Sequence, residues 1–205
     1  MPDDYIFDAR LHRHYIGGRR VTGITEALRL TGLKKQIQSF GMNHASNIEY
    51  AGQRGTAVHK MCELDNQGQT HLYDLDANLL GYLTAWRLFK KEFGFTPLGS
   101  EKPMGHPIYQ FGGIPDSWGI VDKVGGKRAV VEMKTRVLDP DDVFQIAAQA
   151  ILLEHNIQFS AEVGLLMQLK ADGSYSHVLH QNLSMPKKLF LSAVPIANHI
   201  IAREG

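Results

Sequence analysis

The sequence predicts an α/β (α+β) fold in which helices flank a mixed central β-sheet. Two patterns along the chain lead to this prediction. Apolar residues recur at helical spacing between residues 55 and 93, whereas residues 111–135 are rich in β-branched residues and glycine, with a turn between two apolar runs. The 205 residues are 43% hydrophobic and 21% charged, and no linker or repeat divides them. We therefore expect a single domain over residues 1–205 that is large enough to bury a core.

Three helices are expected in the first half of the chain. A short helix begins at Thr22 or Thr25, because strong helix formers follow a capping residue there. A second covers residues 55–67, where apolar side chains form one stripe. A third runs over residues 76–93 and ends at Gly94, since glycine is the usual residue just beyond a helix.

The second half of the chain alternates between strands and helices. Asp139 and Pro140 predict a helix start, because aspartate caps the first turn and proline is tolerated in it. The glycine pairs at 125–126 and the Asp172-Gly173 dipeptide predict turns between strands. Strands are expected over residues 111–121, 129–135, 160–170 and 175–182, and helices over residues 139–155 and from Ser184 onward.

The first 20 residues carry histidines and arginines around the turn Gly17-Gly18. His12 and His14 have H-x-H spacing, but no acid or cysteine pattern nearby supports a zinc site. We expect a basic surface loop that contacts phosphates. The formal net charge is only +1, so binding of nucleic acid has to come from such local patches.

Charged residues interrupt the predicted strand 129–135 in an unusual way. Glu132 and Lys134 share one face with the apolar Val130, because side chains alternate along a strand. Counting back from the turn places Asp116 near the same strand end. Two carboxylates can hold a hard divalent cation, and an ammonium group can orient a water or a phosphate oxygen. The alternative is an ordinary cross-strand salt bridge on a solvated face.

Several motifs resemble the PD-(D/E)XK nuclease superfamily. Gly113-Ile114-Pro115-Asp116, Val130–Thr135 with its Glu-x-Lys triplet, and Gln145 in the next helix stand in the superfamily's order. The chain is most similar to the RecB-type exonuclease branch with its phage and CRISPR-associated members, because Gly55 and His59 match the branch's G-x-x-x-H helix and Val21–Thr25 its lead-in. The resemblance spans about residues 20–155 and implies a restriction-endonuclease-like core.

The resemblance also implies roles for individual residues. Gln149 departs from the branch pattern, which has tyrosine at this position, although it lies one turn after Gln145 on the same helix face. The implied catalytic residues are Asp116, Glu132, Lys134 and Gln145. The implied ligands of Mg²⁺ or Mn²⁺ are His59, Asp116, Glu132 and the carbonyl of Met133. Three further side chains are candidates for a supporting role, Glu101, Glu63 and Gln149, and Arg19, Arg20, Arg54 and Arg136 are candidates for contacts with nucleic acid.

The sequence thus favours a metal-dependent DNA exonuclease that hydrolyses phosphodiester bonds, acting on ends or single strands in phage or bacterial recombination or repair. A homo-oligomer or a recombination protein partner stays open. The alternatives are a nuclease fold that binds DNA or a recombination partner without cutting, and a metalloenzyme acting on a small phosphoester. The single cysteine, Cys62, and the acidic N-terminus without an apolar signal core predict a cytoplasmic protein without membrane association.

Overall fold

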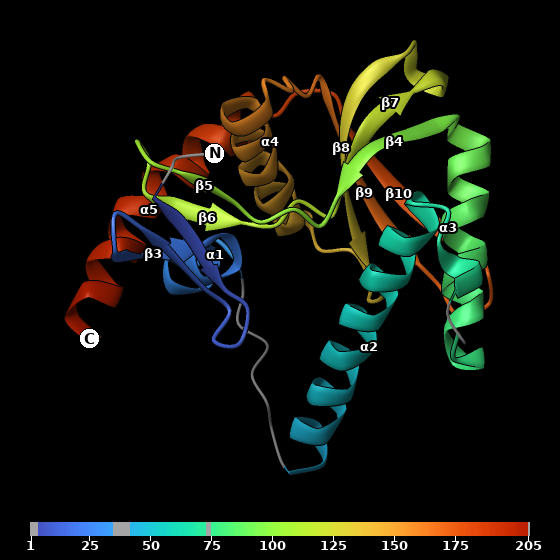
Figure 1. Ribbon diagram of the computed structural model, residues 1–205, viewed down its shortest axis with the longest axis horizontal. Helices are drawn as coiled ribbons and strands as arrows, with labels where there is room; N and C mark the ends of the chain where they lie inside the picture. Colours follow the sequence, from blue (N-terminus) through green and yellow to red (C-terminus); the bar gives the residue numbers. More distant parts are fainter. Residues whose placement is uncertain (1–3, 35–41, 73–74, 205) are drawn as a thin grey trace.

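The computed structural model describes residues 4–34, 42–72 and 75–204. Figure 1 shows two sheets with helices between them and on their outer sides. The strand orders are β1-β2-β3-β6-β5 and β10-β9-β8-β7-β4. Each sheet is mixed, because β3 pairs in parallel with β6, and β8 with β9, while the other pairs are antiparallel. The predicted mixed α/β class is confirmed, with its strands distributed over two sheets.

Each of the two sheets consists of five strands within the described residues. The first sheet consists of β1 (Tyr5–Asp8), β2 (Arg13–Ile16), β3 (Arg19–Gly23), β5 (Met104–His106) and β6 (Phe111–Gly113). The second consists of β4 (Phe95–Ser100), β7 (Ser117–Val121), β8 (Lys127–Lys134), β9 (Val163–Leu169) and β10 (Tyr175–His180). Strands β7 to β10 lie where the sequence predicts strands.

The helices lie where the sequence predicts them, except that the second one extends further toward its N-terminus. They are α1 (Ile24–Leu30), α2 (Met42–Asn66), α3 (Leu80–Phe93), α4 (Val143–Ile157) and α5 (Ser184–Glu204). Gly94 ends α3 in the left-handed conformation, with φ of 60°. Asp139 caps a 3-10 turn, Pro140–Asp142, that leads into α4. Helix α2 begins at Met42, before the predicted start at residue 55. The sequence did not indicate this earlier start, because the residues before 55 lack the apolar stripe of residues 57–64.

The second sheet lies between two apolar layers. Val58 and Met61 of α2 and Trp86 of α3 pack on one face, against the side chains of Val131 and Met133. Residues of α4, α5 and α1 pack on the other face and also against Met104 and Phe111 of the first sheet. Helix α4 therefore contacts both sheets, and Figure 1 shows it between them.

The expected strand 111–121 is wrong as a single element. It breaks at Ile114-Pro115-Asp116, so that β6 pairs in the first sheet and β7 in the second. Proline lacks the N–H group that a central strand uses in its ladder, and a change of sheet avoids this loss. Asp116 therefore stands where the chain passes from one sheet to the other.

The expected basic surface loop at residues 12–14 is also wrong. Arg13 and His14 belong to β2, and Gly17 and Gly18, both at positive φ, form the turn from β2 to β3. Strands β4 and β5 were not predicted, because β4 contains Pro97 and a bulge and β5 is only three residues long.

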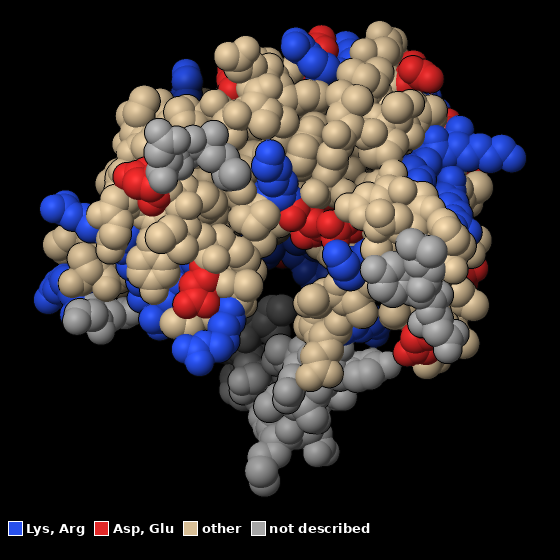
Figure 2. Space-filling model, viewed as in Figure 1, with Lys and Arg blue, Asp and Glu red and all other residues tan. Residues whose placement is uncertain are grey.

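A cavity of about 600 Å³ separates parts of the two sheets. It is visible as a hollow in the middle of the face shown in Figure 2, with acidic side chains at its margin and Lys and Arg side chains nearby. Within the described part of the chain, every helix falls short of the length or the apolar character that a bilayer crossing requires.

Candidate active site and metal centre

Three neighbouring strands of the second sheet end at one edge, and the candidate site lies there. Glu101 directly follows β4, and Asp116 directly precedes β7. Glu132 and Lys134 lie at the end of β8. Because β4, β7 and β8 are adjacent and alternate in direction, these positions meet. The Glu101 N–H donates to the Pro115 carbonyl oxygen at 2.9 Å, which joins the two connecting segments.

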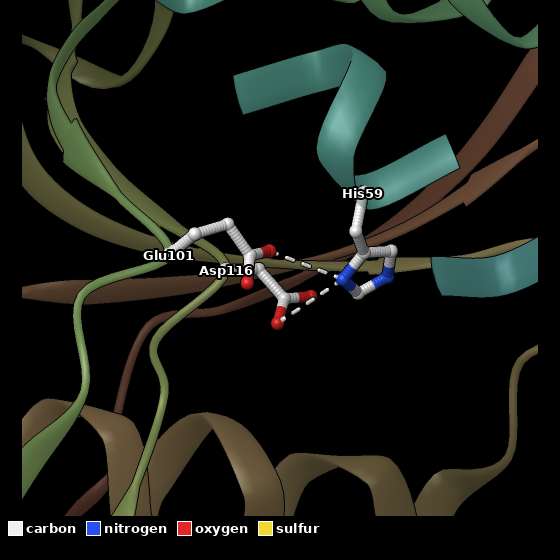
Figure 3. A group of neighbouring side chains, drawn as sticks. All are labelled: His59, Glu101 and Asp116. Carbon is white, nitrogen blue, oxygen red and sulfur yellow. Dashed lines mark hydrogen bonds and ion pairs between the residues drawn. The ribbon is translucent and has the colours of Figure 1, made fainter. Parts of the chain in front are cut away.

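His59, Glu101 and Asp116 form a compact group of potential metal ligands (Figure 3). One donor atom from each lies within 4.8 Å of the others. His59, on α2, places Nδ1 3.2 Å from Glu101 Oε1 and 3.6 Å from Asp116 Oδ1. Asp116 is only 4% exposed, and its Oδ2 accepts the Met133 N–H at 2.8 Å. The backbone of β8 therefore holds this carboxylate in place.

Both ring nitrogens of His59 face oxygen acceptors. Nδ1 donates to Glu101 Oε1, and Nε2 donates to the carbonyl oxygen of Met133 at 3.0 Å. A neutral imidazole donates from one nitrogen only, so this arrangement fits the protonated ring. Burial alone would lower the pKa of His59, but the neighbouring carboxylates, led by Asp116, raise it to about 10.

Glu132 is fully buried on the side of β8 that faces α4. Its carboxylate accepts hydrogen bonds from Lys134 and from Gln149. Lys134 Nζ also donates to Gln145 Oε1 at 3.0 Å. Gln145 and Gln149 are one turn apart on α4, so one face of this helix contacts both the lysine and the acid.

The buried charges perturb one another strongly. Burial and, to a smaller extent, the neighbouring Asp116 raise the pKa of Glu132 to about 7, although Lys134 opposes both effects. Burial also raises the pKa of Asp116, although His59 opposes it. Burial would lower the pKa of Lys134, but Glu132 and Asp116 raise it above its ordinary value. Groups perturbed in this way by burial and by specific partners are typical of functional sites.

The three supporting candidates have different surroundings. Glu101 belongs to the group around His59, and its backbone has φ of 49°, which is uncommon for a residue other than glycine. Gln149 contacts Glu132 and lines the cavity. Glu63 instead accepts hydrogen bonds from Lys60 of the same helix at 2.7 Å and from Gln67, just beyond the helix end, at 3.2 Å.

The four candidate arginines are not gathered in one place. Arg20 lines the 600 Å³ cavity and pairs with Glu26 at 2.5 Å. Arg54 lines a second cavity of about 380 Å³ beside α2. Arg19 is exposed on β3, and Arg136 donates to the buried Asp142.

Sequence reasoning missed cavity residues on the first sheet and α1. Phe7 and Arg29 line the cavity, and neither was a candidate for binding, whereas Arg13 lines it and was expected in a segment that contacts phosphates. A hairpin over residues 5–23 was detectable from the Gly17-Gly18 turn between two runs of β-forming residues.

The donor set fits a hard divalent cation. Two carboxylates and an imidazole lie close enough to coordinate one ion once the ring has given up a proton to free a nitrogen, and Mg²⁺ and Mn²⁺ both accept oxygen-rich sites. The Met133 carbonyl oxygen, an implied ligand, contacts Nε2 of His59, whereas the two carboxylates lie beside Nδ1. Among the described residues, His59, Glu101 and Asp116 form the group that could hold a metal ion. Glu132, an implied ligand, lies outside this group and contacts Lys134 and Gln149 instead.

No family model and no curated protein sequence matches this chain. Solved structures are similar to it at low sequence identity. An alkaline exonuclease from Laribacter hongkongensis, LHK-Exo, has a TM-score of 0.42 and 13% identity, covering 90% of this chain and 92% of the other. LHK-Exo in complex with dAMP gives the same values. A protein designated SSO0001 has a TM-score of 0.36 and 16% identity, covering 85% and 75%. Similarity of this degree carries no conclusion about the activity of this chain.

Proposed function

We propose that this protein is a metal-dependent nuclease that hydrolyses phosphodiester bonds of DNA and acts as an exonuclease. The observation that supports this most strongly is the meeting of His59, Glu101 and Asp116 with the buried pair Glu132–Lys134 at one strand edge, beside a cavity. An isolated surface salt bridge would require neither the buried acids nor the histidine. The motif resemblance supports DNA as the substrate and an exonucleolytic mode, on ends or single strands.

Each residue of the site has a separate role in this proposal. His59, Glu101 and Asp116 hold Mg²⁺ or Mn²⁺. A bound cation would lower the pKa of a water molecule and would offset the negative charge that develops on the phosphate. Lys134 presents a positive charge that orients a water or a phosphate oxygen, and Gln145 and Glu132 fix its ammonium group. Gln149 fixes Glu132 in turn.

The proposal is tested with two variants that keep the size of the side chain, Lys134→Met and Asp116→Asn. Labelled linear and circular DNA are incubated with Mg²⁺, Mn²⁺ or EDTA. The wild type should degrade linear DNA only with metal, and an exonuclease should spare the closed circle. Each variant should lose at least about 100-fold in rate, because Asp116→Asn weakens metal binding and Lys134→Met removes the charge that orients the water or the phosphate oxygen.

Lys127→Ala serves as the matched control, because Lys127 lies at the other end of β8. It should retain the wild-type rate, and thermal unfolding should show that all variants fold. Full activity of Lys134→Met or Asp116→Asn would contradict the proposed mechanism. Binding of DNA by the wild type without any cleavage would support the non-cutting alternative instead.

A further inference from the structure

The first sheet places a row of rings along the cavity. Phe7 of β1 and His14 of β2 are directly paired across the strands, with ring centroids 4.9 Å apart and an interplanar angle of 29°. His12 packs edge-on against Phe7 at 5.2 Å. All three rings line the same cavity as His59 and Asp116. An aromatic surface and the candidate metal centre therefore face one space.

This row of rings is fixed by the fold. The Tyr5 hydroxyl lies 2.8 Å from His14 Nδ1. A Cβ atom at Gly112 would lie 2.5 Å from the His14 ring, so this close packing requires glycine. Asp8 Oδ1 accepts two backbone N–H groups of the following turn, at 2.9 and 3.0 Å, and orders the segment that leads to His12. A preorganised surface of this kind costs little entropy when a ligand binds.

Phe7 is better placed than His14 to meet a ligand. His14 is only 2% exposed, whereas Phe7 is half-buried and borders the cavity. The exposed side chains of Arg13 and Arg29 line the cavity as well. An aromatic ring among cationic side chains is the combination that binds single-stranded nucleic acid, through stacked bases and paired phosphates.

Stacking of an aromatic side chain on a base also favours single-stranded over double-stranded DNA. Inside a duplex, both faces of a base are covered by its neighbours, so away from a duplex end a side chain can stack only on a base that is unpaired or extruded. We propose that Phe7, with His12 at its edge, is a stacking site for an unpaired base of the DNA strand that enters the cavity. This inference rests on the proposed function and deepens it, because it assigns the preference for single-stranded ends to the β1–β2 hairpin.

Binding in EDTA separates this site from catalysis. A fluorescent oligo-dT is titrated with wild type, Phe7→Leu and Phe7→Trp. Phe7→Leu keeps an apolar side chain but removes the π-face, and its affinity should fall about tenfold or more. Phe7→Trp should keep the affinity, and its added fluorescence should be quenched by the bound oligonucleotide. Ile6→Ala is the matched control: Ile6 is 60% exposed, on the other face of β1, and its removal should change nothing.

Two further measurements decide between stacking and a merely structural role. A closed circular duplex should be bound equally by wild type and Phe7→Leu, and a small diester without a base, methyl p-nitrophenyl phosphate, should be cleaved equally by both. The inference would be overturned if wild type and Phe7→Leu bound oligo-dT equally well. It would also be overturned if Phe7→Leu lost duplex binding and cleavage of the small diester to the same extent as oligo-dT affinity. If the wild type cleaves no substrate but Phe7→Leu still loses oligo-dT affinity in EDTA, the proposed function fails and the stacking site stands.

Discussion

Asp142 is a fully buried carboxylate that joins the segment after β8 to the start of α4. Arg136 donates to its Oδ1 at 2.5 Å, and Lys34 Nζ lies 2.9 Å from the same oxygen. The Asp139 N–H donates to Oδ2 at 3.0 Å. Burial alone would raise the pKa of Asp142, but these donors lower it to about 2. Arg136 thus has an anionic partner within the protein, close to the elements that carry Lys134 and its contacts.

The lowered pKa of Asp142 predicts how stability changes with pH. Its ordinary pKa is 3.8, so the ionised form stabilises the folded state above about pH 4. This contribution of about 2 kcal/mol is lost as the pH falls through the folded value of about 2. Asp142→Asn should be less stable than wild type by about 2 kcal/mol or more at neutral pH, and the gap should shrink in acid.

Urea unfolding of both proteins at about pH 7, pH 4 and pH 2.5 measures the gap. The other carboxyl groups titrate in both proteins, so the difference between the two curves isolates Asp142. A gap that stays constant with pH would mean that the charge of Asp142 adds nothing to stability.

Helix ends that are set by residues within one turn were predictable from the sequence. Gly94 ends α3 and Asp139 with Pro140 begins α4, because caps and stops depend on neighbouring residues only. The meeting of Asp116 with the end of β8 was also predictable, by counting from the Gly125-Gly126 turn. These features required no knowledge of the rest of the fold.

Elements that depend on distant partners were not predictable in the same way. The segments on either side of Pro115 pair in different sheets, and the choice of partner is set by packing rather than by propensity. Glu101 meets His59 only because β4, β7 and β8 are neighbours in the sheet, and β4 carries a proline and a bulge that hide it. The cavity wall formed by β1 and β2 was missed for a related reason, since short strands have weak patterns.

Two helical glycines give a matched test of packing between elements. A Cβ atom at Gly81 of α3 would lie 1.7 Å from the carbonyl oxygen of Ala171, in the turn between β9 and β10. Gly52 of α2 is exposed and has no atom within 4 Å of such a Cβ. Gly81→Ala should therefore destabilise the protein by about 1–3 kcal/mol, because α3 must move away from the turn.

Gly52→Ala should instead stabilise the protein by up to about 1 kcal/mol, because alanine loses less backbone entropy in a helix. Urea unfolding of both variants beside the wild type measures the two changes. Equal effects of the two substitutions would show that α3 does not approach the β9–β10 turn this closely.

The charge of the whole molecule is balanced, so the proposed interaction with DNA has to be local. The formal net charge is +1, and Figure 2 shows side chains of both signs distributed over one face. The cavity lining contains four cationic side chains of Lys and Arg, namely Arg13, Arg20, Arg29 and Lys60. A strand that enters the cavity is expected to meet these few charges rather than a broad basic surface.

This small number of cations predicts a shallow dependence of single-strand binding on salt. Each neutralised phosphate contributes a slope of about −0.7 to log K against log salt for single strands, so four cations give at most about −3. Replacing Arg13 and Arg29 together by alanine should reduce the slope by about 1.4. Arg19, a candidate for DNA contact in the sequence, is exposed on β3 and does not line the cavity, so Arg19→Ala should leave the slope unchanged. Titration of oligo-dT in EDTA from about 50 to 200 mM salt measures the slopes. A much steeper slope, or an Arg19→Ala effect as large as that of one cavity arginine, would mean that DNA binds another face.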